Sequence, residues 1–290
     1  MNNKKPPFCV FPTAAEDLKH ACQSESTADS YRLAYSDENF LLRDDLRAIR
    51  LQLEWLKPDL VQQEQGIEST VVVFGGARFL EREKALEKLQ LAKDALAHTP
   101  NDAELLKNYK KAETLLNNSR FYDDARRLST MITQKSLANG GNEYVVVTGG
   151  GPGVMEAANR GAFETGGKTI GLNIVLPFEQ KANPYITPEL CFQFHYFALR
   201  KMHFLKRAVA LIAYPGGFGT LDELFETLTL IQTKKIKPLP VVLMFKDYWK
   251  RVIDFEFLVE QGAITEADTQ LFKIVDNAEE AWSVLEKSWG

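Results

Sequence analysis

The sequence PGGFGTLDELFETLTLIQ, from Pro215 to Gln232, decides the expected fold. It follows a continuous apolar run, residues 208–213, which is typical of a strand buried on both faces. The turn itself is almost bare of side chains, and Thr220 opens a segment whose apolar residues recur at helical spacing. A strand, a bare turn and a helix N-terminus aim free backbone N–H groups and a positive dipole end at one point. Such a point attracts an anion, most often a phosphate.

A second glycine turn, TGGGPGVMEAANRGA at residues 148–162, has the same form and predicts a shared nucleotide site. It does not fit the dinucleotide fingerprint G-x-G-x-x-G, because Val154 stands where the third glycine would be. The acidic residue expected about 20 positions later is also missing, since the next strand ends in Leu172-Asn173. NAD and FAD are therefore not expected. The competing interpretation is a tight strand–helix turn that binds nothing.

Strands and helices are expected to alternate through the rest of the chain. The pattern predicts an α/β fold, a Rossmann-like doubly wound parallel sheet, whose ligands bind at the carboxyl ends of the strands. The expected strands are residues 70–74, 144–147, 169–172, 190–195, 209–213, 239–245 and 272–275. The expected helices between them are residues 154–164, 199–207, 221–232, 248–259 and 278–288.

Two additions to this alternation are predicted. Residues 1–69 form an N-terminal arm with an amphipathic helix over residues 36–55, ended by Lys57-Pro58. Residues 70–290 form the nucleotide-binding domain, with a helical insertion at residues 79–141 that is too long for one crossover helix. Within the insertion, Asn101 or Asp102 is expected to cap a second helix, and Asn117-Asn118 to separate it from a third.

Composition narrows the class of protein. The chain has 290 residues, a net charge of −4 and a pI near 5.7, which argue against a general nucleic-acid binder. The three cysteines form no CxxC pair, and no apolar run approaches the roughly 18 residues of a membrane span. The four histidines do not cluster, so no metal is expected. We expect a cytoplasmic protein that binds neither nucleic acid nor membrane.

Two polar groups stand beside the turn that follows residues 208–213. Thr220 and Glu223 have the spacing of a capping box, so Glu223 serves either as a helix cap or as a carboxylate beside a bound phosphosugar. Spacing alone does not decide between these roles. Upstream, Arg200 and Lys201 lie near the start of a cationic helix, close to the strand ends.

These residues together resemble one family. PGGFGTLDE, with its upstream Arg-Lys pair, the GGGPGVMEAA turn and the opening VVVFGGAR, is similar to the signature of the Lonely Guy (LOG) family, whose members are often labelled lysine decarboxylases. The resemblance covers about residue 70 to the end, with the helical insertion as an addition. It implies a homo-oligomer, a dimer or larger, that hydrolyses the N-glycosidic bond of nucleoside 5′-monophosphates such as AMP or cytokinin riboside monophosphates, without metal or cofactor.

The resemblance also implies roles for individual residues. Arg200 and Glu223 match the family's catalytic pair. The residues that match its phosphate and nucleotide contacts are Gly150, Gly151, Gly153, Gly216, Gly217, Gly219 and Thr220, with Gly75, Gly76 and Lys201 as further candidates. Two departures from the cytokinin-activating pattern, at residues 197–199 and at Gly76, leave the identity of the base open. Together with the N-terminal arm and the insertion, they indicate a longer bacterial subgroup.

Two other functions are weighed against this one. Lysine decarboxylation needs a pyridoxal phosphate Schiff base, and no motif marks its lysine. A nucleotide-binding or carrier protein on the same fold, without turnover, is the serious alternative. The presence of both Arg200 and Glu223 favours the enzyme, and release of ribose 5-phosphate from a nucleotide panel would separate the two.

Overall fold

The computed structural model describes residues 12–21, 28–177 and 181–289. The chain divides into two compact units, residues 1–56 and 57–290. The first unit contains the helices α1 (Ala14–Ala21) and α2 (Glu38–Leu41) and the start of α3 (Arg47–Glu64). Part of the expected N-terminal arm, residues 1–11 and 22–27, lies outside the described residues.

The prediction of a helix over residues 36–55 that ends at Pro58 was wrong. The structure has the short α2 and then α3, which begins at Arg47 and continues past Pro58 to Glu64. A proline inside a helix costs about 3 kcal/mol. Contacts beyond the proline favour the continued helix: Asp59 forms ion pairs of 2.6 Å with both Lys206 and Arg207.

The second unit is built on a parallel sheet of seven strands in the order β4-β3-β2-β1-β5-β6-β7. The strands are β1 (Thr70–Phe74), β2 (Val145–Thr148), β3 (Thr169–Ile174), β4 (Cys191–Phe194), β5 (Ala208–Ala213), β6 (Val241–Met244) and β7 (Phe272–Val275). The strand order runs outward in opposite directions from the β1–β5 pair. This pair is therefore the topological switch point, where open α/β sheets bind their ligands.

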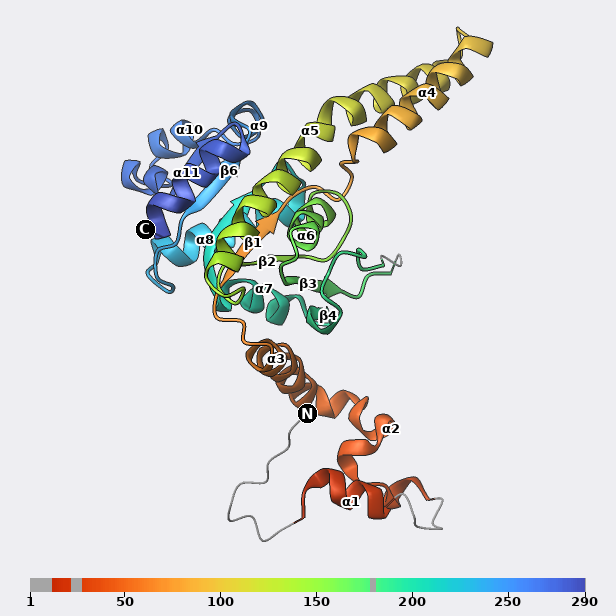
Figure 1. Ribbon diagram of the computed structural model, residues 1–290, viewed down its shortest axis with the longest axis vertical. Helices are drawn as coiled ribbons and strands as arrows, with labels where there is room; N and C mark the ends of the chain where they lie inside the picture. The colour runs from red at the N-terminus through yellow and green to blue at the C-terminus, as the bar shows by residue number, and fades with distance from the viewer. Residues whose placement is uncertain (1–11, 22–27, 178–180, 290) are drawn as a thin grey trace. The chain divides into compact units, whose positions relative to one another are not determined.

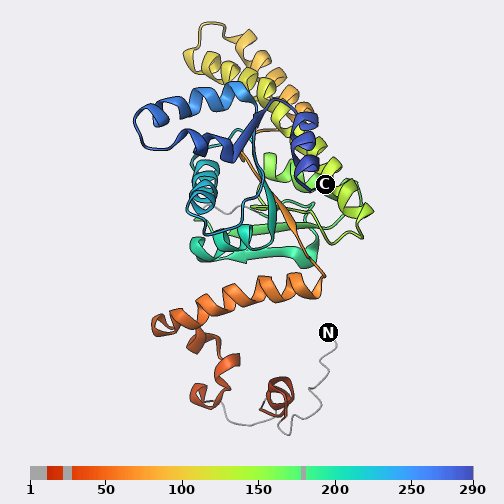
Figure 2. The same cartoon turned by 90° about the vertical axis from the view of Figure 1, so that its left-hand side faces the viewer.

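Helices cover both faces of the sheet, as Figures 1 and 2 show. Alternate residues of β1 point to opposite sides: Val71 and Val73 pack in one core with helices α5, α6 and α11, while Val72 and Phe74 pack in a second core with α7, α8 and α9. The helices are α6 (Val154–Glu164), α7 (Phe197–Lys206), α8 (Phe218–Gln232), α9 (Lys246–Val252), α10 (Phe255–Glu260) and α11 (Ala278–Trp289). The predicted doubly wound α/β fold is confirmed.

The insertion between β1 and β2 forms a hairpin of α4 (Arg82–His98) and α5 (Ala103–Ala138), with α4 beside the first half of α5 in both views (Figures 1 and 2). Asp102 caps α5 as one of the two expected residues, accepting from the N–H groups of Glu104 and Leu105 at 2.8 and 3.0 Å. The predicted break at Asn117-Asn118 was wrong. The helix runs unbroken because its second half, from Ser119 onward, is buried against α6 and the sheet.

Helix α9 is shorter than the expected residues 248–259. The chain leaves α9 after Val252, and Asp254 then caps α10 by accepting from the N–H of Phe257 at 2.9 Å. A local side-chain cap thus starts a new helix within the apolar pattern. Among the described residues, no helix is long and apolar enough to cross a membrane.

Candidate active site

A pocket of about 250 Å³ lies at the carboxyl ends of β1, β2 and β5, where the two glycine turns meet. It brings together most of the predicted site residues. Its lining consists of Phe74, Gly75, Gly76, Ala77, Gly149, Met155, Phe197, Arg200, Gly217, Gly219, Thr220, Asp222 and Glu223. The position agrees with the rule that ligands bind at the switch point of such sheets.

The turn after β5 presents the start of α8 to this pocket. The helix begins at Phe218, with Gly217 as its N-cap and no side-chain capping bond. The N–H groups of Gly217, Phe218 and Gly219 have no acceptor among the described residues. Three unpaired amides at the positive end of a helix dipole favour an anion at this position.

Gly216 does not line the pocket but fixes the shape of this turn. A Cβ there would lie 2.1 Å from the Thr220 hydroxyl, so only glycine allows the close approach. The Tyr248 hydroxyl donates to the Gly216 carbonyl oxygen and lies 3.3 Å from the Gly216 nitrogen, whose N–H it accepts. The turn is therefore held from behind by α9.

The capping-box interpretation of Glu223 was wrong. Helix α8 starts two residues before Thr220, so neither Thr220 nor Glu223 occupies a capping position. The Glu223 carboxylate forms no hydrogen bond with a described residue, although only 7% of Glu223 is exposed. A buried carboxylate that satisfies no backbone group is expensive to keep, which favours a role toward a ligand.

The electrostatics of Glu223 suit proton transfer near neutral pH. Burial raises the pKa of its carboxyl from 4.5 to about 7, and the attraction of Lys201 and Arg200 opposes this rise without cancelling it. Carboxyl groups whose pKa is raised to near neutrality can act as general acids and bases at physiological pH.

Arg200 lines the same pocket as Glu223 and comes from α7. Its Nε donates to the Leu172 carbonyl oxygen at 2.6 Å, and its Nη2 lies 3.5 Å from the Gly149 carbonyl oxygen. Its guanidinium also stacks on Phe204, 5.1 Å from the ring centroid. Burial lowers the pKa of Arg200, and Glu223 counteracts this effect. The guanidinium is thus fixed in direction while donors remain for a ligand.

Lys201 does not line the pocket. Its Nζ lies 3.0 Å from both Asp222 and Glu226, and so ties α7 to α8. Burial lowers its pKa, but the two carboxylates outweigh burial and raise it. Lys201 acts on the pocket through charge, because it holds down the pKa of Glu223.

The GGGPG turn contributes differently from the prediction. Gly149 lines the pocket, whereas Gly150, Gly151 and Gly153 do not. A Cβ at Gly149 would lie 2.6 Å from the Arg200 guanidinium, which therefore needs glycine there. Gly153 has φ of +73°, and a Cβ on it would lie 2.3 Å from the Gly76 carbonyl oxygen. Gly153 therefore shapes the junction between the two glycine turns, whereas a Cβ on Gly150 would meet the Asn173 side chain.

A buried amide network supports the GGGPG turn, and sequence reasoning missed it. Asn183 donates from its backbone N–H to the Gly150 carbonyl oxygen at 2.9 Å and from Nδ2 to the Gly151 carbonyl oxygen at 3.1 Å. Its Nδ2 also donates to Asn159 Oδ1, which accepts from the Thr148 hydroxyl as well. No local sequence pattern connects these positions, since they meet only through the fold.

Other lining residues also went unpredicted. Met155 and Phe197 give the pocket an apolar side, and Asp222 adds a second carboxylate. Met155 directly follows the GGGPGV turn, so its place at a helix start after a glycine turn was the available signal. Among the described residues, no group of three or more His, Cys, Asp or Glu side chains is arranged to hold a metal ion.

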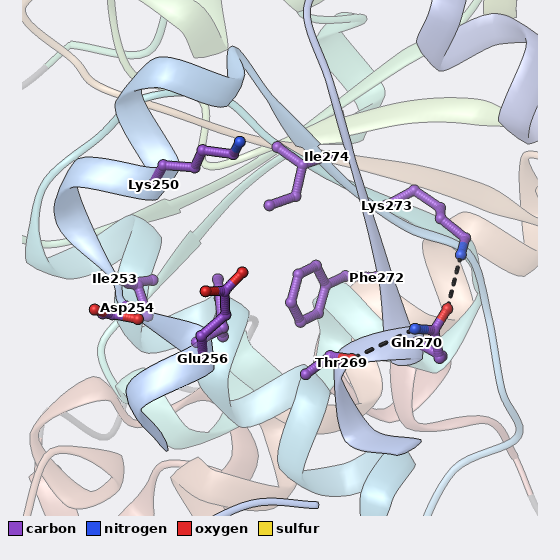
Figure 3. Close-up of a pocket in the computed structure, with 10 residues that line it drawn as sticks. Lys250, Ile253, Asp254, Glu256, Thr269, Gln270, Phe272, Lys273 and Ile274 are labelled. Carbon is purple, nitrogen blue, oxygen red and sulfur yellow. Dashed lines mark hydrogen bonds between the residues drawn. The ribbon is translucent and has the colours of Figure 1, made fainter. Parts of the chain in front are cut away.

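A larger pocket of about 630 Å³ lies at the β7 edge of the sheet (Figure 3). It contains none of the predicted site residues. Lys250, Asp254 and Glu256 enter it from the α9–α10 segment, while Lys273 is held by Gln270 at 3.3 Å. Asp254 already caps α10. In this larger pocket, Asp254 and Lys273 already have hydrogen-bond partners, and Lys250 and Glu256 carry opposite charges. The pocket between the glycine turns is therefore the better candidate for the active site.

Comparison with known proteins points to the same family. The family model described as possible lysine decarboxylase matches residues 155–285. The probable cytokinin riboside 5′-monophosphate phosphoribohydrolase LOGL3 of Oryza sativa subsp. japonica is 30% identical over 148 residues, which are 49% of this chain and 68% of that protein. LOG4 of the same plant, with the same probable activity, is 31% identical over 49% of this chain and 61% of its own length.

Among solved structures, one that matches this chain is that of a molybdenum cofactor binding protein from the phototrophic bacterium Rippkaea orientalis. It is 18% identical, with a TM-score of 0.45, and the match covers 77% of this chain and 98% of that one.

Proposed function

The chain belongs to the LOG family, and we propose that it hydrolyses the N-glycosidic bond of nucleoside 5′-monophosphates, releasing the free base and ribose 5-phosphate. The observation that carries the proposal is Glu223. It is a buried carboxyl with a pKa of about 7 and no hydrogen-bond partner among the described residues, and it stands in one small pocket with Arg200 and free helix amides.

In this proposal, the substrate phosphate sits at the start of α8. The unpaired N–H groups of Gly217 and Gly219 donate to it, and the helix dipole adds a favourable field. Arg200 supplies a fixed guanidinium in the same pocket. Binding energy from the unreacting phosphate is then spent on orienting the sugar.

Glu223 acts on the sugar itself. Cleavage of a glycosidic bond passes through an oxocarbenium-like transition state, in which positive charge builds on the ribose. The Glu223 carboxylate stabilises that charge and, as a general base, takes a proton from the attacking water. The water oxygen bonds to C1′ as the bond from C1′ to the base nitrogen breaks, and the proton passes from the Glu223 carboxyl, whose pKa is near neutrality, to the departing base, which regenerates the carboxylate. A positioned general base contributes about 10²–10⁴-fold in rate.

The base extends toward the apolar rim of the pocket. Phe197 lines the pocket and is 54% exposed. An exposed ring that lines a pocket is suited to a planar heteroaromatic base. We propose residues 70–290 as the nucleotide-binding domain that carries the activity, with residues 79–141 as an insertion within it. We also propose that the protein is a homo-oligomer.

Ribose 5-phosphate release from AMP tests the roles of the two side chains. We expect Glu223→Gln to lower kcat by about 10²–10⁴-fold while AMP affinity changes little, because the phosphate contacts remain. Arg200→Ala should weaken AMP binding as well. Near wild-type turnover in Glu223→Gln would refute the proposal. Tight binding of nucleotides with no turnover by the wild type would instead identify a carrier.

A further inference from the structure

A separate cavity of about 440 Å³ lies between α5 and α9. It is lined by Phe79, Asn118, Arg120, Phe121, Asp247, Tyr248, Arg251 and Val252. None of these residues lines the active-site pocket. Three lining residues belong to the insertion helix α5 and four to α9, which follows β6. The cavity has the size of an ordinary small-molecule site, about 300–1,000 Å³.

Two arginines give this cavity a positive charge. Neither Arg120 nor Arg251 forms an ion pair or hydrogen bond with another residue in the part of the chain that the structure describes, and both are exposed. The Arg120 guanidinium lies over Phe121, 5.1 Å from the ring centroid, which restrains its direction. Asp247 is the single carboxylate in the lining. Two guanidinium groups without an ion pair or hydrogen bond to a described residue are well suited to phosphate.

The remaining walls are largely aromatic. Phe79, Tyr248 and Phe121 line the cavity, and Phe121 is only 4% exposed. Aromatic faces beside arginines favour a ligand that carries a flat ring together with phosphate. We propose that this cavity is a second nucleotide site, distinct from the active site, whose occupant acts on the active-site turns.

The cavity contacts both active-site turns through its own lining residues. The Tyr248 hydroxyl holds Gly216 by its N–H and its carbonyl oxygen, and Gly216 precedes the proposed phosphate amides. On the other side, the Phe79 ring packs on Gly76, where an added Cβ would lie 2.6 Å from it. A ligand that moves the Tyr248 ring therefore changes the turn that precedes the proposed phosphate amides, and one that moves the Phe79 ring changes the first glycine turn at Gly76, which lines the same pocket.

Calorimetric titration of the full chain with ATP tests the site. We expect Arg120→Gln combined with Arg251→Gln to weaken ATP binding at least tenfold. The matched control combines Lys107→Gln and Lys111→Gln, which remove the same charge from exposed positions on α5; its affinity should stay within twofold of wild type. Adenosine and pyrophosphate should each bind more weakly than ATP.

Three results would overturn the proposal: no ATP binding at millimolar concentration, equal binding by all three proteins, or loss of all binding in Arg200→Ala, which would place ATP in the active site.

Hydrogen exchange tests the coupling without requiring turnover, so its outcome is independent of the proposed reaction. ATP should change amide exchange in residues 214–220 of the wild type at least threefold. In Tyr248→Phe, which lacks the hydroxyl that holds Gly216, ATP should still bind while the change in exchange disappears. An identical exchange response in wild type and Tyr248→Phe would contradict coupling through this side chain.

Discussion

Replacing Glu223 with glutamine should stabilise the protein while it removes activity. The carboxyl has a pKa of about 7 in the folded protein against 4.5 ordinarily, because it is buried. This raised pKa means that folding favours the protonated form. The contribution is fully present below about pH 4.5 and is lost as the pH rises through 7. A shift of this size corresponds to at most about 3 kcal/mol at pH 8.

Glutamine resembles the protonated carboxyl in shape but cannot ionise. The free energy of unfolding of Glu223→Gln should therefore exceed that of the wild type by about 1–3 kcal/mol at pH 8, and by much less at pH 5. Urea unfolding at the two pH values measures this difference. Glu87→Gln, at an exposed position on α4, serves as the control and should change neither value.

Equal stability of wild type and Glu223→Gln at pH 8 would refute the raised pKa. A variant less stable than wild type at both pH values would show that the carboxylate has a structural partner.

Three further changes test the surroundings of the pocket. Gly153→Ala should lower the free energy of unfolding by about 1–3 kcal/mol and reduce kcat/KM, because its φ of +73° and a backbone contact of 2.3 Å leave no room for a methyl group; urea unfolding and AMP kinetics measure both. Asp124→Ala should cost about 1–3 kcal/mol in urea unfolding, because it removes the acceptor, at 2.8 Å, of the fully buried Tyr214 hydroxyl. Lys201→Met should shift the apparent pKa of the pH–rate profile upward, because Lys201 lowers the pKa of Glu223; an unchanged profile would show that another group titrates.

The sequence was sufficient for the sheet and for the elements that place the site. Buried parallel strands are continuous apolar runs, so β1 and β5 could be predicted from the sequence. The glycines that follow these strands indicated the turns. Arg200 and Glu223 were predicted as site residues because they accompany the specific motif PGGFGTLDE.

Contacts between distant segments could not be predicted in the same way. The continuity of α5 through Asn117-Asn118 depends on its burial against α6, which opposes the local preference for a break. Whether Glu223 caps a helix depends on where α8 begins. The spacing of Thr220 and Glu223 fits a capping box as well as it fits a carboxylate beside a bound phosphosugar. The support of the GGGPG turn by Asn183 joins residues that are about 30 positions apart.

The central claim is tested most directly by measuring whether release of the base depends on the 5′-phosphate of the substrate. The wild-type protein should be incubated with a panel of nucleoside 5′-monophosphates and with the matching nucleosides, and ribose 5-phosphate, ribose and free base quantified. We predict equimolar base and ribose 5-phosphate from at least one monophosphate, and turnover of its nucleoside at least 100-fold slower, because the α8 amides and Arg200 act on the phosphate. Release from no monophosphate, or equal turnover of nucleoside and nucleotide, would contradict it.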